Sequence, residues 1–103
     1  MVSFIETKLF SHLLSDYLTD DDYAALQRAL ADAPERGAVI KGSGGVRKLR
    51  WSQPGRGKRG GVRVIYYAKT HEEVIWLLTI YAKNEEQSIP AHVLRKIKEE
   101  IDA

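Results

Sequence analysis

Most of the positive charge of this 103-residue chain is concentrated in its middle third. Between Arg36 and His71 there is no Asp or Glu, whereas all fourteen acidic residues lie in the rest of the chain. The net charge of +2 therefore conceals a basic segment on an otherwise acidic molecule, which produces a strong local positive field. We expect a polyanion-binding surface rather than a solvated loop with incidental charge. Its ten Lys and Arg residues are Arg36, Lys41, Arg47, Lys48, Arg50, Arg56, Lys58, Arg59, Arg63 and Lys69.

Alternation along the chain sorts some of these bases onto one face of an expected sheet. In the strand expected over 46–52, Leu49 and Trp51 are apolar and should face a core beneath helices. Successive side chains of a strand point to opposite faces, so Lys48 and Arg50 should lie on the other, open face.

Two further expected strands add to this face. Arg63 lies mid-strand in 62–69 and has no acidic residue near it in sequence. The last strand ends near Tyr81 and Lys83, whose side chains should reach the rim of a groove. One side of that strand is expected to carry Leu77, Thr79, Tyr81 and Lys83. Cations that hold phosphates beside an aromatic ring that stacks on bases are the combination typical of RNA-binding surfaces.

Other chemistries lack suitable residues. The chain has no Cys, which excludes disulfides, thiolate metal sites and cysteine nucleophiles. His12, His71 and His92 show no metal-ligand spacing, so we expect no metal and no other cofactor. The glycine-rich run 42–45 leads into a strand, whereas phosphate-binding loops open a helix.

The elements that must position these residues follow from hydrophobic periodicity and turn signals. The pattern predicts a strand over 2–6, helices over 8–18 and 20–33, strands over 46–52, 62–69 and 73–82, and a final helix capped by Ser88. The segment 53–61 joins two strands as a hairpin loop, and strand 73–82, the most apolar, is expected to be central. We predict one α+β domain over 1–103, of order β-α-α-β-β-β-α, with two N-terminal helices packed on a mainly antiparallel sheet.

Location follows by default. No apolar run approaches the roughly 18 residues needed to span a bilayer, and the N-terminus does not resemble a secretion signal. We expect a cytoplasmic protein with no membrane partner.

Three segments taken together resemble the RelE superfamily of toxins. They are 44–50 (GGVRKLR), 57–67 (GKRGGVRVIYY) and 78–85 (LTIYAKNE). The Lys-Arg-Gly-Gly sequence is similar to the HigB-like branch of that superfamily. The expected order of elements also fits, so the resemblance covers nearly the whole chain.

The resemblance implies a toxin of a type II toxin–antitoxin system. Such a protein cleaves messenger RNA without a metal, usually inside the ribosome, and its partners are a cognate antitoxin, the ribosome and mRNA. The 2′-hydroxyl attacks the adjacent phosphate and the 5′-oxygen leaves, giving a cyclic phosphate. Clustered Lys and Arg can stabilise the extra negative charge of the transition state.

The resemblance also implies residue roles. Lys48 and Arg50 match the paired basic positions of the family, and Arg63 matches the arginine that contacts the scissile phosphate. Lys83 matches the basic residue that ends the last strand, and Tyr81 is a stacking residue. A tyrosine of the family's C-terminal segment has no counterpart in 85–93. Further RNA-binding residues are expected at Arg47, Arg56, Lys58 and Arg59.

Two other functions stay open. A non-catalytic RNA- or ribosome-binding module would use the same bases as a nuclease. A gyrase-inhibiting toxin of the related ParE kind would bind protein and would not need a cationic active face. Mapping transcript ends after expression identifies the nuclease, which creates new RNA ends. DNA damage signals the gyrase inhibitor, and neither appears for the binding module.

Overall fold

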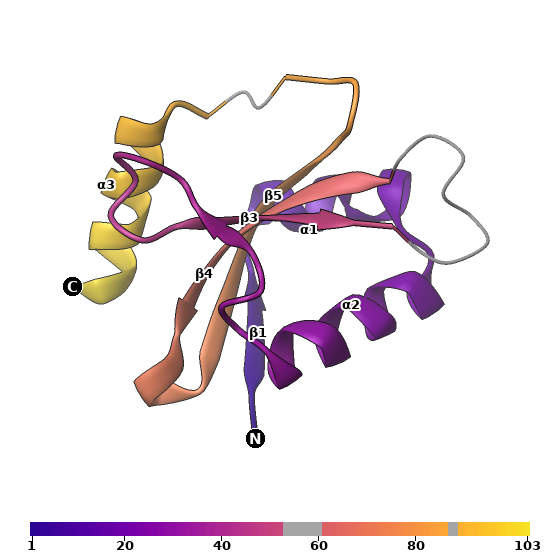
Figure 1. Cartoon of the computed structure of the whole chain (residues 1–103), viewed down its shortest axis with the longest axis horizontal. Coiled ribbons are helices and arrows are strands. Elements are labelled where there is room, and N and C mark those ends of the chain that lie inside the picture. Colours follow the sequence, from indigo (N-terminus) through magenta and orange to yellow (C-terminus); the bar gives the residue numbers. More distant parts are fainter. Residues whose placement is uncertain (53–60, 87–88) are drawn as a thin grey trace.

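A five-stranded mixed sheet in the order β1-β5-β4-β3-β2 forms the frame of the protein (Figure 1). The structure, a computed structural model, describes residues 1–52, 61–86 and 89–103. The elements are β1 (Ser3–Glu6), α1 (Lys8–Tyr17), α2 (Asp20–Asp32), β2 (Ala38–Val39), β3 (Arg47–Trp51), β4 (Val62–Lys69), a 3₁₀ turn (Thr70–Glu72), β5 (Val74–Ala82) and α3 (Ala91–Asp102).

This architecture confirms the expected α+β class and the mainly antiparallel sheet. Only β1 runs parallel to its neighbour, β5, and the other three pairings are antiparallel. Two details of the expectation are wrong. The short strand β2 extends the sheet beyond β3, and β4 rather than β5 therefore holds the middle position. Residue 88, the expected helix cap, lies outside the described residues, and Pro90 precedes the first turn of α3.

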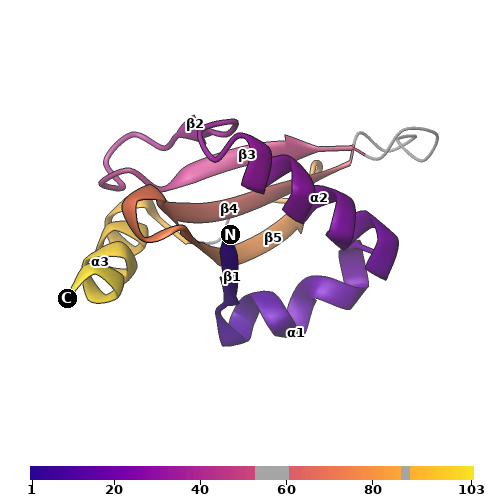
Figure 2. The same cartoon turned by 90° about the horizontal axis from the view of Figure 1, so that it is seen from below.

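The two N-terminal helices pack together on one face of the sheet (Figure 2). Phe10 from α1 and Leu26 from α2 are fully buried with Val64 and Leu77 of the sheet. Thr19 begins α2 through a capping box, in which its hydroxyl accepts from the Asp22 backbone N–H at 3.1 Å. We call this side of the sheet the helix-pair face.

The opposite face is not wholly open, because α3 covers one end of it. Leu94 is buried there with Val46, Ile65 and Leu78. An amphipathic helix must bury its apolar stripe, so the expectation of an entirely open face was incomplete. We call this side the α3 face.

A β-bulge changes the alternation in β5. Ile65 of β4 pairs with Thr79, whereas the next residue, Tyr66, pairs with Leu77, so Leu78 is the extra residue. Leu77 consequently packs on the helix-pair face while Leu78 and Tyr81 pack on the α3 face. The expectation that Leu77 and Tyr81 share one side is wrong for this reason.

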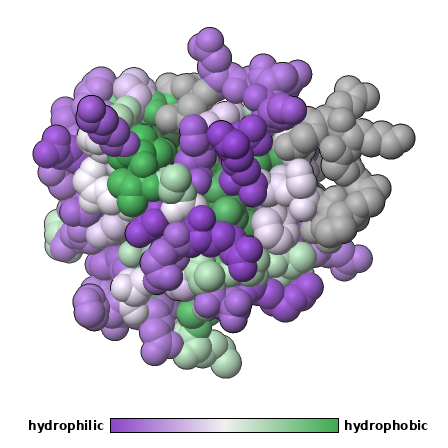
Figure 3. Space-filling view, viewed as in Figure 1, coloured by the Kyte–Doolittle hydropathy of each residue, from purple (hydrophilic) through white to green (hydrophobic). Residues whose placement is uncertain are grey.

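Hydrophilic side chains dominate the surface seen in Figure 3, where apolar side chains form small separate patches. No helix in the described ranges is long and apolar enough to cross a membrane.

Candidate functional site

Two arginines and a tyrosine form a continuous row across three neighbouring strands. Arg50 of β3 pairs directly with Arg63 of β4, and Arg63 pairs directly with Tyr81 of β5. Side chains of directly opposite residues in antiparallel strands start about 4.5–5.5 Å apart at Cβ. All three belong to the α3 face, because their neighbours Leu49, Val64 and Ile80 pack in the helix-pair core. The structure thus brings together the residues that alternation assigned to one face.

The two arginines of this row lack acidic partners in the part of the chain that the structure describes. Within the described ranges neither Arg50 nor Arg63 forms an ion pair, although like charges on directly opposite positions destabilise a sheet. Arg50 is exposed and Arg63 is half-buried. Their positive charge is therefore available to an external anion.

Lys48 extends the cationic surface toward the edge of the sheet. It lies two residues before Arg50 on the same face and pairs with Ile65. A depression of about 320 Å³ at this edge is lined by Arg36, Ala38, Lys48, Leu49 and Arg50. It exists because β2 pairs with β3 only at Arg47 and Lys48, which leaves the edge beyond them open.

Tyr81 and Lys83 close the other side of the surface. Burial raises the pKa of Tyr81, and the charge of nearby Arg63 partly opposes that rise. The phenol is therefore neutral at physiological pH and can donate a hydrogen bond. Lys83 is exposed in the turn after β5, where its backbone N–H donates to the carbonyl of Gly61 at 3.3 Å. That bond holds the turn next to the start of β4.

Comparison with known proteins identifies the family to which the chain belongs. The family model described as the RelE toxin of the RelE / RelB toxin-antitoxin system matches residues 5–101. The chain belongs to the RelE toxin family. The fold is also similar to a chain of the intact E. coli RelBE toxin-antitoxin complex, with a TM-score of 0.57 and 13% identity over 84% of this chain and 100% of that one. The HigB-like branch stays a prediction.

One expected RNA-binding residue of this RelE-family chain lies apart from the others. Arg47 lies on the helix-pair side of β3, and its Nη1 donates to the backbone carbonyls of Gly37 at 2.8 Å and Glu35 at 3.3 Å. It thereby fixes the segment that leads into β2. Its role toward RNA stays a prediction. The other expected contacts, Arg56, Lys58 and Arg59, lie outside the described residues.

The structure adds Arg36 to the cationic surface of this RelE-family protein. Arg36 is one of the ten bases of the basic segment, but a two-residue strand leaves almost no alternation from which its position could be predicted. The pairing of Ala38 with Lys48 brings the preceding residues to the edge of β3. Across residues 1–52, 61–86 and 89–103, no group of three or more His, Asp or Glu is placed to hold a metal ion.

Proposed function

We propose that this RelE-family toxin is a metal-independent endoribonuclease that cleaves messenger RNA in the ribosome and so inhibits translation. Its active site is the surface formed by Lys48, Arg50, Arg63, Tyr81 and Lys83. The observation that carries the proposal is the direct pairing of Arg50, Arg63 and Tyr81 across three strands. It places two positive charges, which have no acidic partner among the described residues, beside an aromatic ring.

The reaction is an internal transesterification of the RNA backbone. The 2′-oxygen attacks the adjacent phosphorus, the bond from phosphorus to the 5′-oxygen breaks, and a 2′,3′-cyclic phosphate forms. The 2′-hydroxyl loses a proton and the departing 5′-oxygen gains one. The nucleophile and the leaving group both belong to the substrate, so the protein must orient the phosphate and stabilise its extra negative charge.

The cationic residues divide this work by position. Arg63, in the middle of the row, binds the scissile phosphate, and Arg50 beside it stabilises the charge that develops on the phosphate oxygens. An arginine fork matches a phosphate bidentately, which fixes its orientation as well as neutralising it. Lys48 and Lys83 flank the row on opposite sides and hold the neighbouring phosphates.

Tyr81 provides a surface for stacking, which the cations do not. Its half-buried ring offers a surface on which a base can stack, a contact worth about 1–3 kcal/mol in single-strand recognition. Arg47, Arg56, Lys58 and Arg59 are proposed to contact RNA away from the reacting phosphate. The partners are mRNA, the ribosome and a cognate antitoxin, and the place of action is the cytoplasm.

The chemistry of the cut ends tests this mechanism. Purified protein is added to ribosomes translating a defined mRNA, and both new ends are characterised. The mechanism gives a cyclic phosphate on one fragment and a 5′-hydroxyl on the other. A 3′-hydroxyl with a 5′-phosphate would require water as the nucleophile and would overturn it, and intact mRNA would support the non-catalytic binding module.

A further inference from the structure

Lys83 differs from the other residues of the proposed active site because it lies outside the strands. The others belong to β3, β4 and β5, whose pairing fixes their backbone. β5 ends at Ala82, so Lys83 begins the turn that follows, where its side chain is exposed. Its N–H donates to the carbonyl of Gly61 at 3.3 Å, which is a long hydrogen bond. The position of Lys83 therefore depends on what closes this turn.

Glu85 closes the turn by bonding to both backbone groups of Ala82. The Ala82 N–H donates to Oε1 of Glu85 at 2.7 Å, and the Glu85 N–H donates to the Ala82 carbonyl at 3.0 Å. The pairing of β1 with β5 stops at Leu77, so no described strand lies beside that edge of β5 at Ala82. Glu85 thus takes the place of a neighbouring strand at the end of β5.

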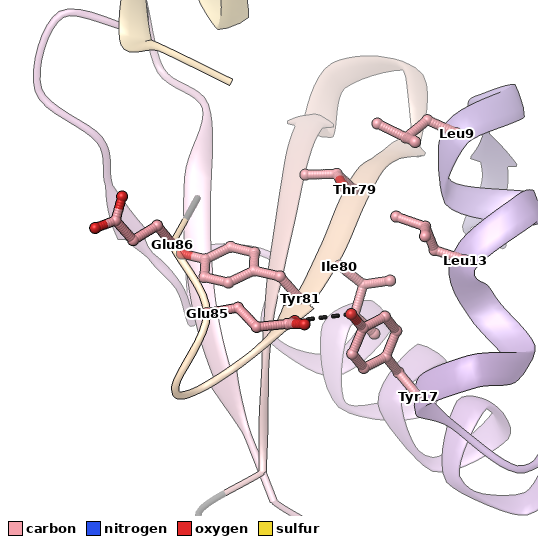
Figure 4. A pocket seen from close by; sticks show the side chains of 8 residues that line it. All are labelled: Leu9, Leu13, Tyr17, Thr79, Ile80, Tyr81, Glu85 and Glu86. Carbon is pink, nitrogen blue, oxygen red and sulfur yellow. Dashed lines mark hydrogen bonds between the residues drawn. The ribbon is translucent and has the colours of Figure 1, made fainter. Parts of the chain in front are cut away.

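Tyr17, the last residue of α1, fastens the same carboxylate to the helix pair (Figure 4). Its hydroxyl donates to Oε1 of Glu85 at 2.7 Å. Both residues line a cavity of about 250 Å³ between α1 and β5, and their side chains point toward one another. The Tyr17 ring packs against the helix-pair core, which fixes the position of its hydroxyl. We call this arrangement of Tyr17, Glu85 and the Ala82 backbone the Tyr17–Glu85 clasp.

The two side chains of the clasp keep each other in the protonation states that the bond requires. The hydrogen bond to Glu85 raises the pKa of Tyr17. The bonds from the Ala82 N–H and the Tyr17 hydroxyl lower the pKa of Glu85. At neutral pH the phenol is therefore protonated and donates, while the carboxylate is ionised and accepts. Hydrogen bonds to an ionised acceptor are roughly twice as strong as those between neutral groups.

We propose that the Tyr17–Glu85 clasp positions Lys83 against a phosphate of the RNA, so that Tyr17 and Glu85 are positioning residues of the nuclease. The inference rests on the proposed function, in which Lys83 holds a phosphate beside the one that is cut. A carboxylate two residues after Lys83 repels a polyanion, so its presence there calls for a structural reason, which the clasp provides. A misplacement of about 1 Å can cost 10²-fold in rate, even when its cause lies away from the reacting atoms.

Single-turnover cleavage of mRNA on ribosomes, at saturating toxin, tests the clasp bond by bond. Glu85→Ala removes every side-chain bond and is expected to slow cleavage about 10²-fold, whereas Tyr17→Phe removes only the bond from α1 and is expected to slow it about tenfold. Glu85→Gln keeps an acceptor oxygen and should stay within a few-fold of the wild-type rate. Tyr23→Phe is the matched control, because it deletes a similar bond on the helix pair, from the Tyr23 hydroxyl to Glu6 at 2.6 Å. It should cleave at the wild-type rate.

A double-mutant cycle tests whether the clasp acts through Lys83, with Tm measured to show that each variant folds. Lys83→Ala removes the side chain that the clasp positions, so Tyr17→Phe should slow cleavage no further in that background. Three results would each overturn the clasp and leave the nuclease intact: equal losses from Tyr17→Phe with and without Lys83, a wild-type rate in Tyr17→Phe, or Glu85→Gln as slow as Glu85→Ala. Absence of cleavage by wild type would instead overturn the nuclease itself.

Discussion

Arg47 and Arg50 lie three residues apart on β3 and serve different purposes. Arg47 donates to two backbone carbonyls on the helix-pair side, whereas Arg50 faces Arg63 with no acidic partner in the described ranges. Arg47 therefore stabilises the fold, whereas Arg50 is available to bind an anion. Functional sites commonly retain such locally unfavourable arrangements.

Alanine at each position is expected to separate the two roles. Arg47→Ala should lower the free energy of unfolding by about 1–2 kcal/mol, because a charged donor to two carbonyls is lost. Arg50→Ala should leave stability unchanged or slightly higher, since it removes a like-charge pair. Urea denaturation measures both values.

Cleavage rates should follow the reverse order. Arg50→Ala is expected to lose about 10²-fold in rate, as for one transition-state contact, while Arg47→Ala keeps most of its activity per folded molecule. A large loss in Arg47→Ala at unchanged stability would show that its backbone contacts are not its main role.

The C-terminal end of α3 is joined to β4 by the Asp102 carboxylate and by the Ile101 backbone carbonyl, which accepts from Lys69 Nζ at 3.4 Å. Asp102 accepts from the Tyr67 hydroxyl at 2.9 Å and pairs with Lys98 at 3.1 Å and Lys69 at 3.6 Å. Desolvation acts to raise the pKa of Asp102, but the bonds from Lys98 and Tyr67 and the two lysine charges outweigh it and lower the pKa.

This anchor predicts a pH-dependent contribution to stability. A carboxyl with a lowered pKa in the folded state stabilises above its unfolded value of about 3.9 and stops doing so as the pH falls through the folded pKa. Asp102→Asn should therefore lower Tm near neutral pH, and the difference from wild type should disappear in acid. A difference in Tm that is equal at both pH values would contradict the role of the charge.

Much of the element pattern could be predicted from sequence. The apolar stripe of α3 and the alternation of Leu49 and Trp51 with Lys48 and Arg50 rest on local periodicity. The Thr19 cap rests on residue type, which is equally local. Since that alternation is local, it also assigned the bases of β3 to the face opposite the helices.

The remaining features depend on contacts distant in sequence. The bulge at Leu78 interrupts a strand that is apolar at nearly every position, so periodicity gave no sign of it. β2 pairs at two residues and has no pattern of its own. The register that sets Arg50 opposite Arg63 depends on the pattern of both strands and on the turn type of their connection. A glycine-rich run in sequence does not specify that turn type, so the register could not be predicted.

At the scale of the whole molecule, the cationic surface and the helix pair lie on different sides of the sheet. The first turn of α2 carries Asp20, Asp21 and Asp22, which gives the helix pair an acidic end far from the bases in sequence. We expect the antitoxin to dock on this acidic side and to inhibit by adding bulk that keeps the toxin out of the ribosome.

This docking route predicts how antitoxin affinity responds to mutation. Alanine at Lys48, Arg50 and Arg63 together should leave the Kd for the antitoxin within a few-fold of wild type, as measured by calorimetry. If the antitoxin instead covers the cationic surface, the triple variant should lose several kcal/mol of binding, as hot-spot residues do. That result would show that the antitoxin inhibits by covering the cationic surface and not by keeping the toxin out of the ribosome.

Arg63, at the middle of the row, is proposed to contact the phosphate that is cut. The most direct measurement expresses wild type and Arg63→Ala at equal levels in bacterial cells and sequences all RNA ends. Wild type should stop growth and create new ends within translated reading frames. Arg63→Ala should fold with an unchanged Tm, permit growth and reduce those ends by about 10²- to 10³-fold. Full toxicity with the same ends in folded Arg63→Ala would show that Arg63 does not contact the scissile phosphate.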